Sequence, residues 1–356
     1  MIDWNIIKSL SPHPAHIQKP RILSKGNPPL VFQNNNGFLS NYKIFGNTIK
    51  NSSTFTDVGE YISDTNSPYY QKYCIPIQIS GINMLDLNSV VMNAYINAQG
   101  EETQSIAGLN HSDYIRVEPL TVYTLEIYSP TSPNTIAMNW FDSEKNILSA
   151  RNTVNVAFGE HKVWSVQSPE NAAYLIVNFV SDRQNEIMLF KGSDSHTFEP
   201  YHEPLLYNIY TDVPVSKTQN EHDVIDYRNS RLKKNIRSLS FTGNENWQKQ
   251  QNDFLLAISG NKNADIICSH YENADISSDS SHCLHITSSD FNSADAFKNY
   301  LSSQNINGTP VTIYYAADIP EIYTLELPNI TTLDGTNILA FGTSVQPDIV
   351  HITCQI

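Results

Sequence analysis

Paired acidic side chains are the residues of this sequence best suited to catalysis, because enzymes that cleave polysaccharides hold two carboxyl groups ~5 to 9.5 Å apart across a sugar bond. Glu101 with Glu102 and Asp142 with Glu144 are such pairs, but both fall in polar loop or turn patterns. The sequence also contains no GxSxG, HExxH or phosphate-loop motif. We therefore expect that the protein is not an enzyme, and a polysaccharide depolymerase is a distant alternative.

Thiols and imidazoles suggest metal binding at one place, where His282, Cys283 and His285 are close in sequence. In an extended strand the HCLH spacing puts the two histidines on opposite faces or across a bend, and no second ligand pair follows. We expect no metal and no cofactor. The cysteines lack CxxC spacing and lie in apolar runs, which favours free thiols over disulfides. They are Cys74, Cys268, Cys283 and Cys354.

Sugar binding is the sharper prediction for the polar side chains. Aromatic rings stack on pyranose faces and carboxamides bind hydroxyl groups, so a sugar site needs both on neighbouring strands. The candidates are Tyr174 and Asn178 on one strand, Asn139 with Trp140 or Phe141 on another, and Trp164. The alternative is that both tryptophans belong to a sandwich core, which is where most tryptophans in such folds lie.

The elements that would position these residues are short strands. From 113 to 204, apolar and polar residues alternate between Pro and Asn breaks, which is typical of half-buried strands in a β-sandwich. Within 174–180 the odd-numbered residues face the core, so Tyr174 and Asn178 are expected on the outer face. One helix is predicted at 294–303, capped by Ser293. The fold class is therefore all-β, with a sandwich module and a second β-rich domain that carries this short helix.

Composition and charge narrow the partners. The chain has 356 residues, 22 Lys plus Arg and a net charge of -14, which argues against a nucleic-acid partner. No apolar run is long enough to span a membrane or to act as a secretion signal. Residues 1–34 are rich in proline and predict an extended arm. Its anchors for a neighbouring subunit would be Trp4, Ile6, Ile7 and Leu10. A loose tail or an arm folded onto its own domain is the alternative.

Several motifs occur in an order that resembles a known family. YKIFGN at 42–47 is followed by YCIPIQISG at 73–81, then DVIDYRN, GNENW and finally LPNITTLDGTNI. Their order resembles that of tail and baseplate proteins of phages and phage-tail-like particles of Firmicutes, which carry a jelly-roll, carbohydrate-binding-like module. A turn glycine of that family is Ser230 here, so Asn229 is expected to adopt the left-handed conformation.

The resemblance implies a domain plan and a role. Residues 1–34 would be the anchoring arm, 35–82 would pack with a C-terminal domain at 204–356, and 83–203 would be the jelly-roll module. The protein would be a virion or tail-particle component of the tail tip or baseplate, made in the host cytoplasm and released by lysis. We expect it to form a homotrimer, to contact other tail proteins and to bind a host cell-wall glycan. A structural connector without a ligand is the alternative.

Overall fold

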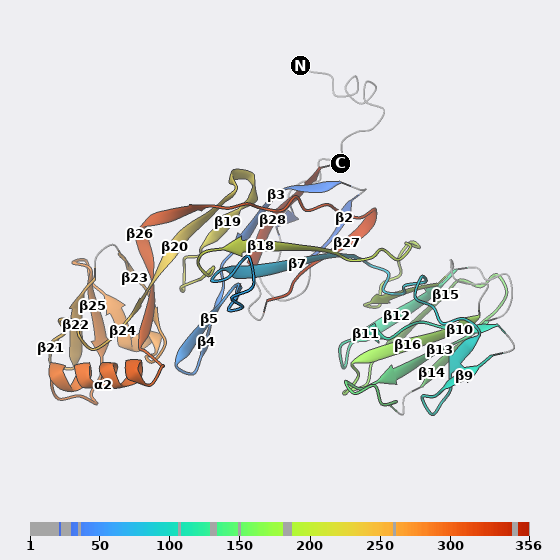
Figure 1. The fold of residues 1–356 in the computed structure, drawn as a ribbon, viewed down its shortest axis with the longest axis horizontal. Coiled ribbons are helices and arrows are strands. Elements are labelled where there is room, and N and C mark those ends of the chain that lie inside the picture. The colour runs from blue at the N-terminus through green and yellow to red at the C-terminus, as the bar shows by residue number, and fades with distance from the viewer. Residues whose placement is uncertain are drawn as a thin grey trace, which may run out of the picture.

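The computed structural model describes residues 21–22, 30–34, 37–105, 108–128, 134–148, 151–180, 187–258, 261–343 and 348–355. These residues form three lobes in a row (Figure 1). The sandwich lobe (82–203) and the helix lobe (239–316) lie at the two ends of the long axis, and the remaining described residues form the central lobe between them. The sheets are antiparallel throughout, which confirms the predicted all-β fold class.

The central lobe packs two sheets around one apolar core. The first has the order β1 (Arg21–Ile22), β28 (Asp348–Gln355), β3 (Phe38–Phe45), β19 (Val224–Asp226), β20 (Arg231–Ser240), β26 (Thr312–Thr324) and β23 (Asn261–Cys268). This sheet continues into the helix lobe, where β23 and the first residues of β26 lie. The second has the order β18 (Leu205–Thr211), β7 (Tyr73–Gly81), β27 (Gly335–Phe341) and β2 (Leu30–Asn34), and β6 (Glu60–Tyr61) also pairs with β7. A hairpin of β4 (Thr48–Asn51) and β5 (Thr54–Asp57), and the 3-10 turn η2 (Tyr227–Asn229), complete the lobe.

Strand β7 shows how the alternating pattern produces this core. Ile75, Ile77 and Ile79 are all buried, because residues two apart in a strand point to the same face. β7 pairs with β18 on one side and β27 on the other. The chain therefore enters and leaves the sandwich lobe on neighbouring strands.

The sandwich lobe places two sheets face to face. One contains β10 (Leu109–His111), β16 (Tyr174–Val180), β13 (Asn134–Phe141) and β14 (Asn152–Val156), with β11 (Ile115–Arg116) also paired to β16. The other contains β15 (Lys162–Gln167), β12 (Val122–Ile127) and β17 (Ile187–Lys191). A separate hairpin joins β8 (Ala94–Ile96) to β9 (Glu102–Gln104). Leu125 and Ile127 of one sheet and Val177 of the other are buried in the shared core.

In the helix lobe, α2 (Ala294–Ile306) packs with a four-stranded sheet. The sheet order is β21 (Gln248–Gln250), β22 (Asp253–Ala257), β25 (Cys283–Thr287) and β24 (Ile276–Ser278), and the 3-10 turn η3 (Asn273–Asp275) precedes β24. Ser293 caps the helix as predicted, because its hydroxyl accepts a hydrogen bond from the Ala296 backbone N–H at 3.1 Å. The helix extends three residues past the predicted end at 303. Its Phe297 and Leu301 are buried against the sheet.

The turn before β20 and the N-terminal arm differ from what the sequence predicted. The left-handed residue in the turn before β20 is Ser230 (φ 47°), not Asn229, because Asn229 belongs to η2 and its carboxamide donates to Asp226. Residues 30–34 of the expected arm pair with β27 as strand β2. The predicted anchors Trp4, Ile6, Ile7 and Leu10 lie outside the described residues.

No helix in the described ranges has the length and apolar character needed to cross a membrane.

Candidate ligand-binding site

The face of the sandwich that was expected to be open is covered at Asn178. Leu175, Val177 and Phe179 point into the core as predicted, but Ile176 and Asn178 on the other side of β16 are also buried. The β8–β9 hairpin lies over them. The Asn178 carboxamide donates to the Ile96 carbonyl at 2.8 Å and accepts from the Ile96 N–H at 2.9 Å. Asn178 therefore holds a second layer in place instead of facing solvent.

Three other predicted sugar-binding residues are also engaged in packing. Asn139 and Trp140 have no exposed surface, and the Trp140 indole N–H donates to Asn152 at 2.8 Å from within the core. Trp164 lies on the opposite sheet, half-buried against the same core. The structure thus brings Asn139 and Asn178 near each other on adjacent strands but leaves both inaccessible, and Trp164 is not on their face of the sandwich.

Tyr174 is half-buried on the outer face of β16, and it has a partner the sequence did not reveal. Its ring meets that of Tyr114 edge-on with centroids 5.8 Å apart, and Tyr114 packs edge-on against Phe141 at 5.1 Å. The Lys145 ammonium lies 4.4 Å from the Tyr114 centroid. A tight turn presents this lysine, because the Asp142 carboxylate accepts hydrogen bonds from the backbone N–H groups of residues 144 and 146. We call Tyr114 and Tyr174 the tyrosine pair.

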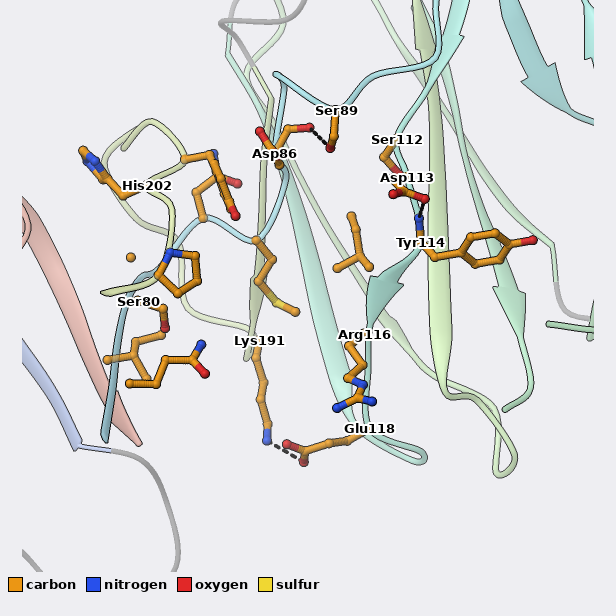
Figure 2. Close-up of a pocket in the computed structure, with 18 residues that line it drawn as sticks. Ser80, Asp86, Ser89, Ser112, Asp113, Tyr114, Arg116, Glu118, Lys191 and His202 are labelled. Carbon is orange, nitrogen blue, oxygen red and sulfur yellow. Dashed lines mark hydrogen bonds and ion pairs between the residues drawn. The ribbon is translucent and has the colours of Figure 1, made fainter. Parts of the chain in front are cut away.

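A cleft of about 530 Å³ opens where the sandwich lobe meets the central lobe, and we call it the junction cleft (Figure 2). This volume is within the range of small-ligand sites. Its wall includes side chains from the end of β7, the 82–91 segment, β11, β17 and the 199–204 segment. The polar members are Gln78, Ser80, Asn83, Asp86, Ser89, Ser112, Asp113, Tyr114, Arg116, Glu118, Lys191, Tyr201 and His202.

Arg116 connects the junction cleft with the tyrosine pair. It lines the cleft, and in the antiparallel register of β11 and β16 it lies directly opposite Tyr174. Side chains of such a cross-strand pair point to the same face of the sheet. Tyr114 is two residues before Arg116, and its ring extends away from the cleft (Figure 2). The guanidinium, the cleft and the two rings therefore form one continuous surface.

Both charge signs occur in the junction cleft. Lys191 donates to Glu118 at 2.6 Å, and Asp86, Asp113 and Arg116 add further charges. Burial, followed by the nearby Asp113 carboxylate, raises the pKa of Tyr114. Burial, followed by Asp86 and Glu203, likewise raises the pKa of Tyr201. Both phenol groups are therefore protonated at neutral pH and able to donate hydrogen bonds.

A chain of polar contacts fixes the two lobes on either side of the junction cleft. Asn83 accepts hydrogen bonds from the N–H groups of Leu85 and Leu189 and donates to the carbonyl of Glu199. The Glu199 carboxylate in turn accepts from the Thr336 backbone N–H at 2.7 Å and from its hydroxyl at 2.6 Å. Because Thr336 belongs to β27, this network ties the entry and exit of the sandwich to the central lobe.

No family model matches the chain, and no curated protein matches it. Among solved structures, the chain is similar to the enzymatically active domain of tailspike protein 4 from bacteriophage CBA120, with 12% identity and a TM-score of 0.20. The alignment covers 38% of this chain and 21% of that one. A similarity of this size carries no argument about mechanism.

The expectation that the chain is not an enzyme is corrected here. The aligned tailspike structure is an enzymatically active domain. The acidic pairs found in the sequence fall in loop or turn patterns, whereas the carboxylates of Asp86, Asp113 and Glu118 line the junction cleft. The exclusion of catalysis is therefore withdrawn.

Proposed function

We propose that this chain is a tail or baseplate protein of a phage or phage-like particle that binds a host cell-wall glycan on its sandwich lobe. The particle role rests on the ordered motifs that resemble the tail-protein family. The ligand would lie in the junction cleft and extend over Arg116 onto the tyrosine pair. Of the residues predicted from the sequence, this path includes Tyr174 and leaves out Asn139, Trp140, Trp164 and Asn178.

The chemistry of this surface suits a sugar chain. Aromatic rings contact the apolar faces of pyranose rings, while guanidinium, carboxylate and phenol groups bind hydroxyl groups in fixed directions. The junction cleft supplies the polar groups and the tyrosine pair supplies the rings. Lys145 is exposed at the end of a turn, so an incoming sugar can displace its ammonium from the Tyr114 ring.

The observation that carries the proposal is the register that places Arg116 opposite Tyr174. Tyr114 itself lines the cleft, and the register adds Tyr174 on the same face of the sheet as Arg116. A polar cleft and an aromatic surface therefore meet at Arg116, as a ligand longer than a single sugar would require.

Co-sedimentation with purified cell walls of Firmicutes tests the proposal. We expect the wild-type protein to sediment with the walls and the Arg116→Ala variant to remain largely in the supernatant, because this change removes the group that both parts share. The control is Lys217→Ala on the central lobe. If the wild-type protein sediments with none of the walls tested, the structural-connector alternative replaces the proposal. Release of reducing ends from the walls would show in addition that the site cleaves its ligand.

A further inference from the structure

We propose that Asp279, Cys283 and His285 of the helix lobe form a zinc-binding site. One ligand atom from each residue lies within 4.8 Å of those of the other two. The three residues supply the carboxylate oxygen, thiolate sulfur and imidazole nitrogen that zinc binds in proteins. This site is separate from the junction cleft, because the helix lobe lies at the other end of the molecule (Figure 1).

The local fold brings the three ligands together. Cys283 and His285 are two residues apart on β25, so they share its outer face, while Leu284 and Ile286 point into the core. Asp279 precedes a three-residue hairpin loop whose last residue, His282, has φ 59°. The loop closes with hydrogen bonds from the Asp279 N–H to the Cys283 carbonyl and from the His282 N–H to the Asp279 carbonyl, both 3.0 Å. It returns the Asp279 side chain to the outer face.

The Asp279 carboxylate is oriented for a metal. Its Oδ1 accepts hydrogen bonds from the backbone N–H groups of Ser281 at 2.8 Å and Cys283 at 3.0 Å. Its Oδ2 lies 3.2 Å from Nε2 of His285. Two ligand atoms that each lie ~2.05 Å from a tetrahedral zinc ion are ~3.3 Å apart. Oδ2 and Nε2 share a hydrogen bond at this separation, and a zinc ion that replaced the proton would find its two ligand atoms already at the required spacing.

The other side of the imidazole also fits this interpretation. Nδ1 of His285 lies 3.9 Å from Oδ2 of Asp253 on the neighbouring strand β22. The other oxygen of Asp253 accepts a hydrogen bond from the Thr287 hydroxyl at 2.7 Å. The 3.9 Å separation of Nδ1 and Asp253 is that of an ion pair and not of a hydrogen bond, and a carboxylate on this side of the imidazole leaves Nε2 for the metal. Three protein ligands leave a fourth position for water or a group of another molecule.

The sequence did not predict this site, because the HCLH pattern suggests His282 and His285 as the two ligands, and these lie on opposite faces of an extended strand. His282 lies in the hairpin loop and is not part of the cluster. The spacing that matters is Cys283 to His285, two residues apart on one strand face, with Asp279 added by the turn.

Zinc titration of the chelator-treated full-length protein, followed by calorimetry, tests the proposal. We expect one equivalent of zinc to bind the wild-type protein and to raise its melting temperature. Cys283→Ser and His285→Gln should each weaken this binding at least tenfold. The matched control is His282→Asn, since asparagine tolerates the left-handed conformation at this position, and it should bind zinc like the wild type.

Cobalt substitution separates this site from adventitious binding. The wild-type and His282→Asn proteins should show the near-ultraviolet absorption of a thiolate bound to cobalt, and Cys283→Ser should lose it. A Cys74→Ser variant should retain it, because that thiol is on the central lobe. Absence of one-equivalent binding in the wild type, or unchanged cobalt absorption in Cys283→Ser with a native circular dichroism spectrum, would overturn the proposal.

Discussion

The carboxamide of Asn178 is paired with both backbone polar groups of Ile96, donating at 2.8 Å and accepting at 2.9 Å. Both residues are buried, so neither backbone group has access to water. This contact holds the β8–β9 hairpin on the outer face of the sandwich. It explains why a residue with the right chemistry for sugar binding is unavailable for it.

Replacing Asn178 with alanine should destabilise the sandwich lobe. A buried polar group that loses its partner costs about 1–3 kcal/mol, and here two such groups are left, so we expect a loss of about 2–6 kcal/mol. Urea unfolding followed by tryptophan fluorescence measures it. The control is Asn155→Ala, which removes an exposed hydrogen bond to Thr135 and should change stability by less than ~0.5 kcal/mol. Equal effects of the two variants would contradict this role of Asn178.

Glu126 should make the protein sensitive to acid. Burial by itself would raise the pKa of Glu126, but hydrogen bonds from Ser195, His196 and His161 together lower it below the usual value. The folded pKa is therefore below the unfolded one, so the contribution to stability is complete above the unfolded pKa. It is lost as pH falls through the folded pKa.

The measurement is thermal unfolding of the wild type and Glu126→Gln between neutral pH and about pH 3. The wild type should lose stability below about pH 5, and the variant should be less stable at neutral pH with a shallower decline on the acid side. Parallel curves for the two proteins would show that Glu126 does not cause the acid sensitivity.

The buried ion pair of Asp223 and Lys234 should contribute far more to the free energy of unfolding than an exposed ion pair does. Nζ of Lys234 lies 2.5 Å from Asp223, whose carboxylate also accepts from the N–H groups of Ser216 and Ile236. Asp223→Asn leaves a buried ammonium without its counterion, which costs about 3–5 kcal/mol. Asp212→Asn, which breaks an exposed pair with Lys72, should cost at most ~1 kcal/mol. Denaturant titration of both variants compares them, and similar losses would refute the distinction.

Gly243 should tolerate no side chain. Its φ is +86°, and a Cβ there would lie 2.4 Å from the Lys298 carbonyl oxygen of α2. Gly159 also has a positive φ, +67°, but a Cβ there would meet nothing within 4 Å. Gly159→Ala should therefore cost only the conformational strain, about 1–2 kcal/mol. Gly243→Ala must in addition displace the helix, so its melting temperature should be clearly lower. If the two melting temperatures agree, the close approach of helix and loop is not a constraint.

Local patterns in the sequence predicted much of the fold but less of the site. The alternation within 174–180 identified Leu175, Val177 and Phe179 as core residues, and Ser293 marked the start of α2. The pattern could not show that the outer face of β16 is covered, because the hairpin that covers Asn178 is encoded about eighty residues earlier and touches it through tertiary contacts. Tyr114 and Arg116 were missed for the same reason, since only the register of β11 and β16 brings them beside Tyr174.

Calorimetric titration with a soluble cell-wall oligosaccharide tests the central claim most directly, in the wild type, Tyr114→Ala and Phe158→Ala. Tyr114 belongs to the tyrosine pair, whereas Phe158 is an aromatic residue with 72% of its surface exposed in the loop before β15. A stacked ring contributes about 1 kcal/mol, or roughly fivefold in affinity. We predict that Tyr114→Ala binds about fivefold more weakly and that Phe158→Ala binds like the wild type. Equal affinity of Tyr114→Ala and wild type, with Phe158→Ala weakened, would contradict the proposed location of the glycan.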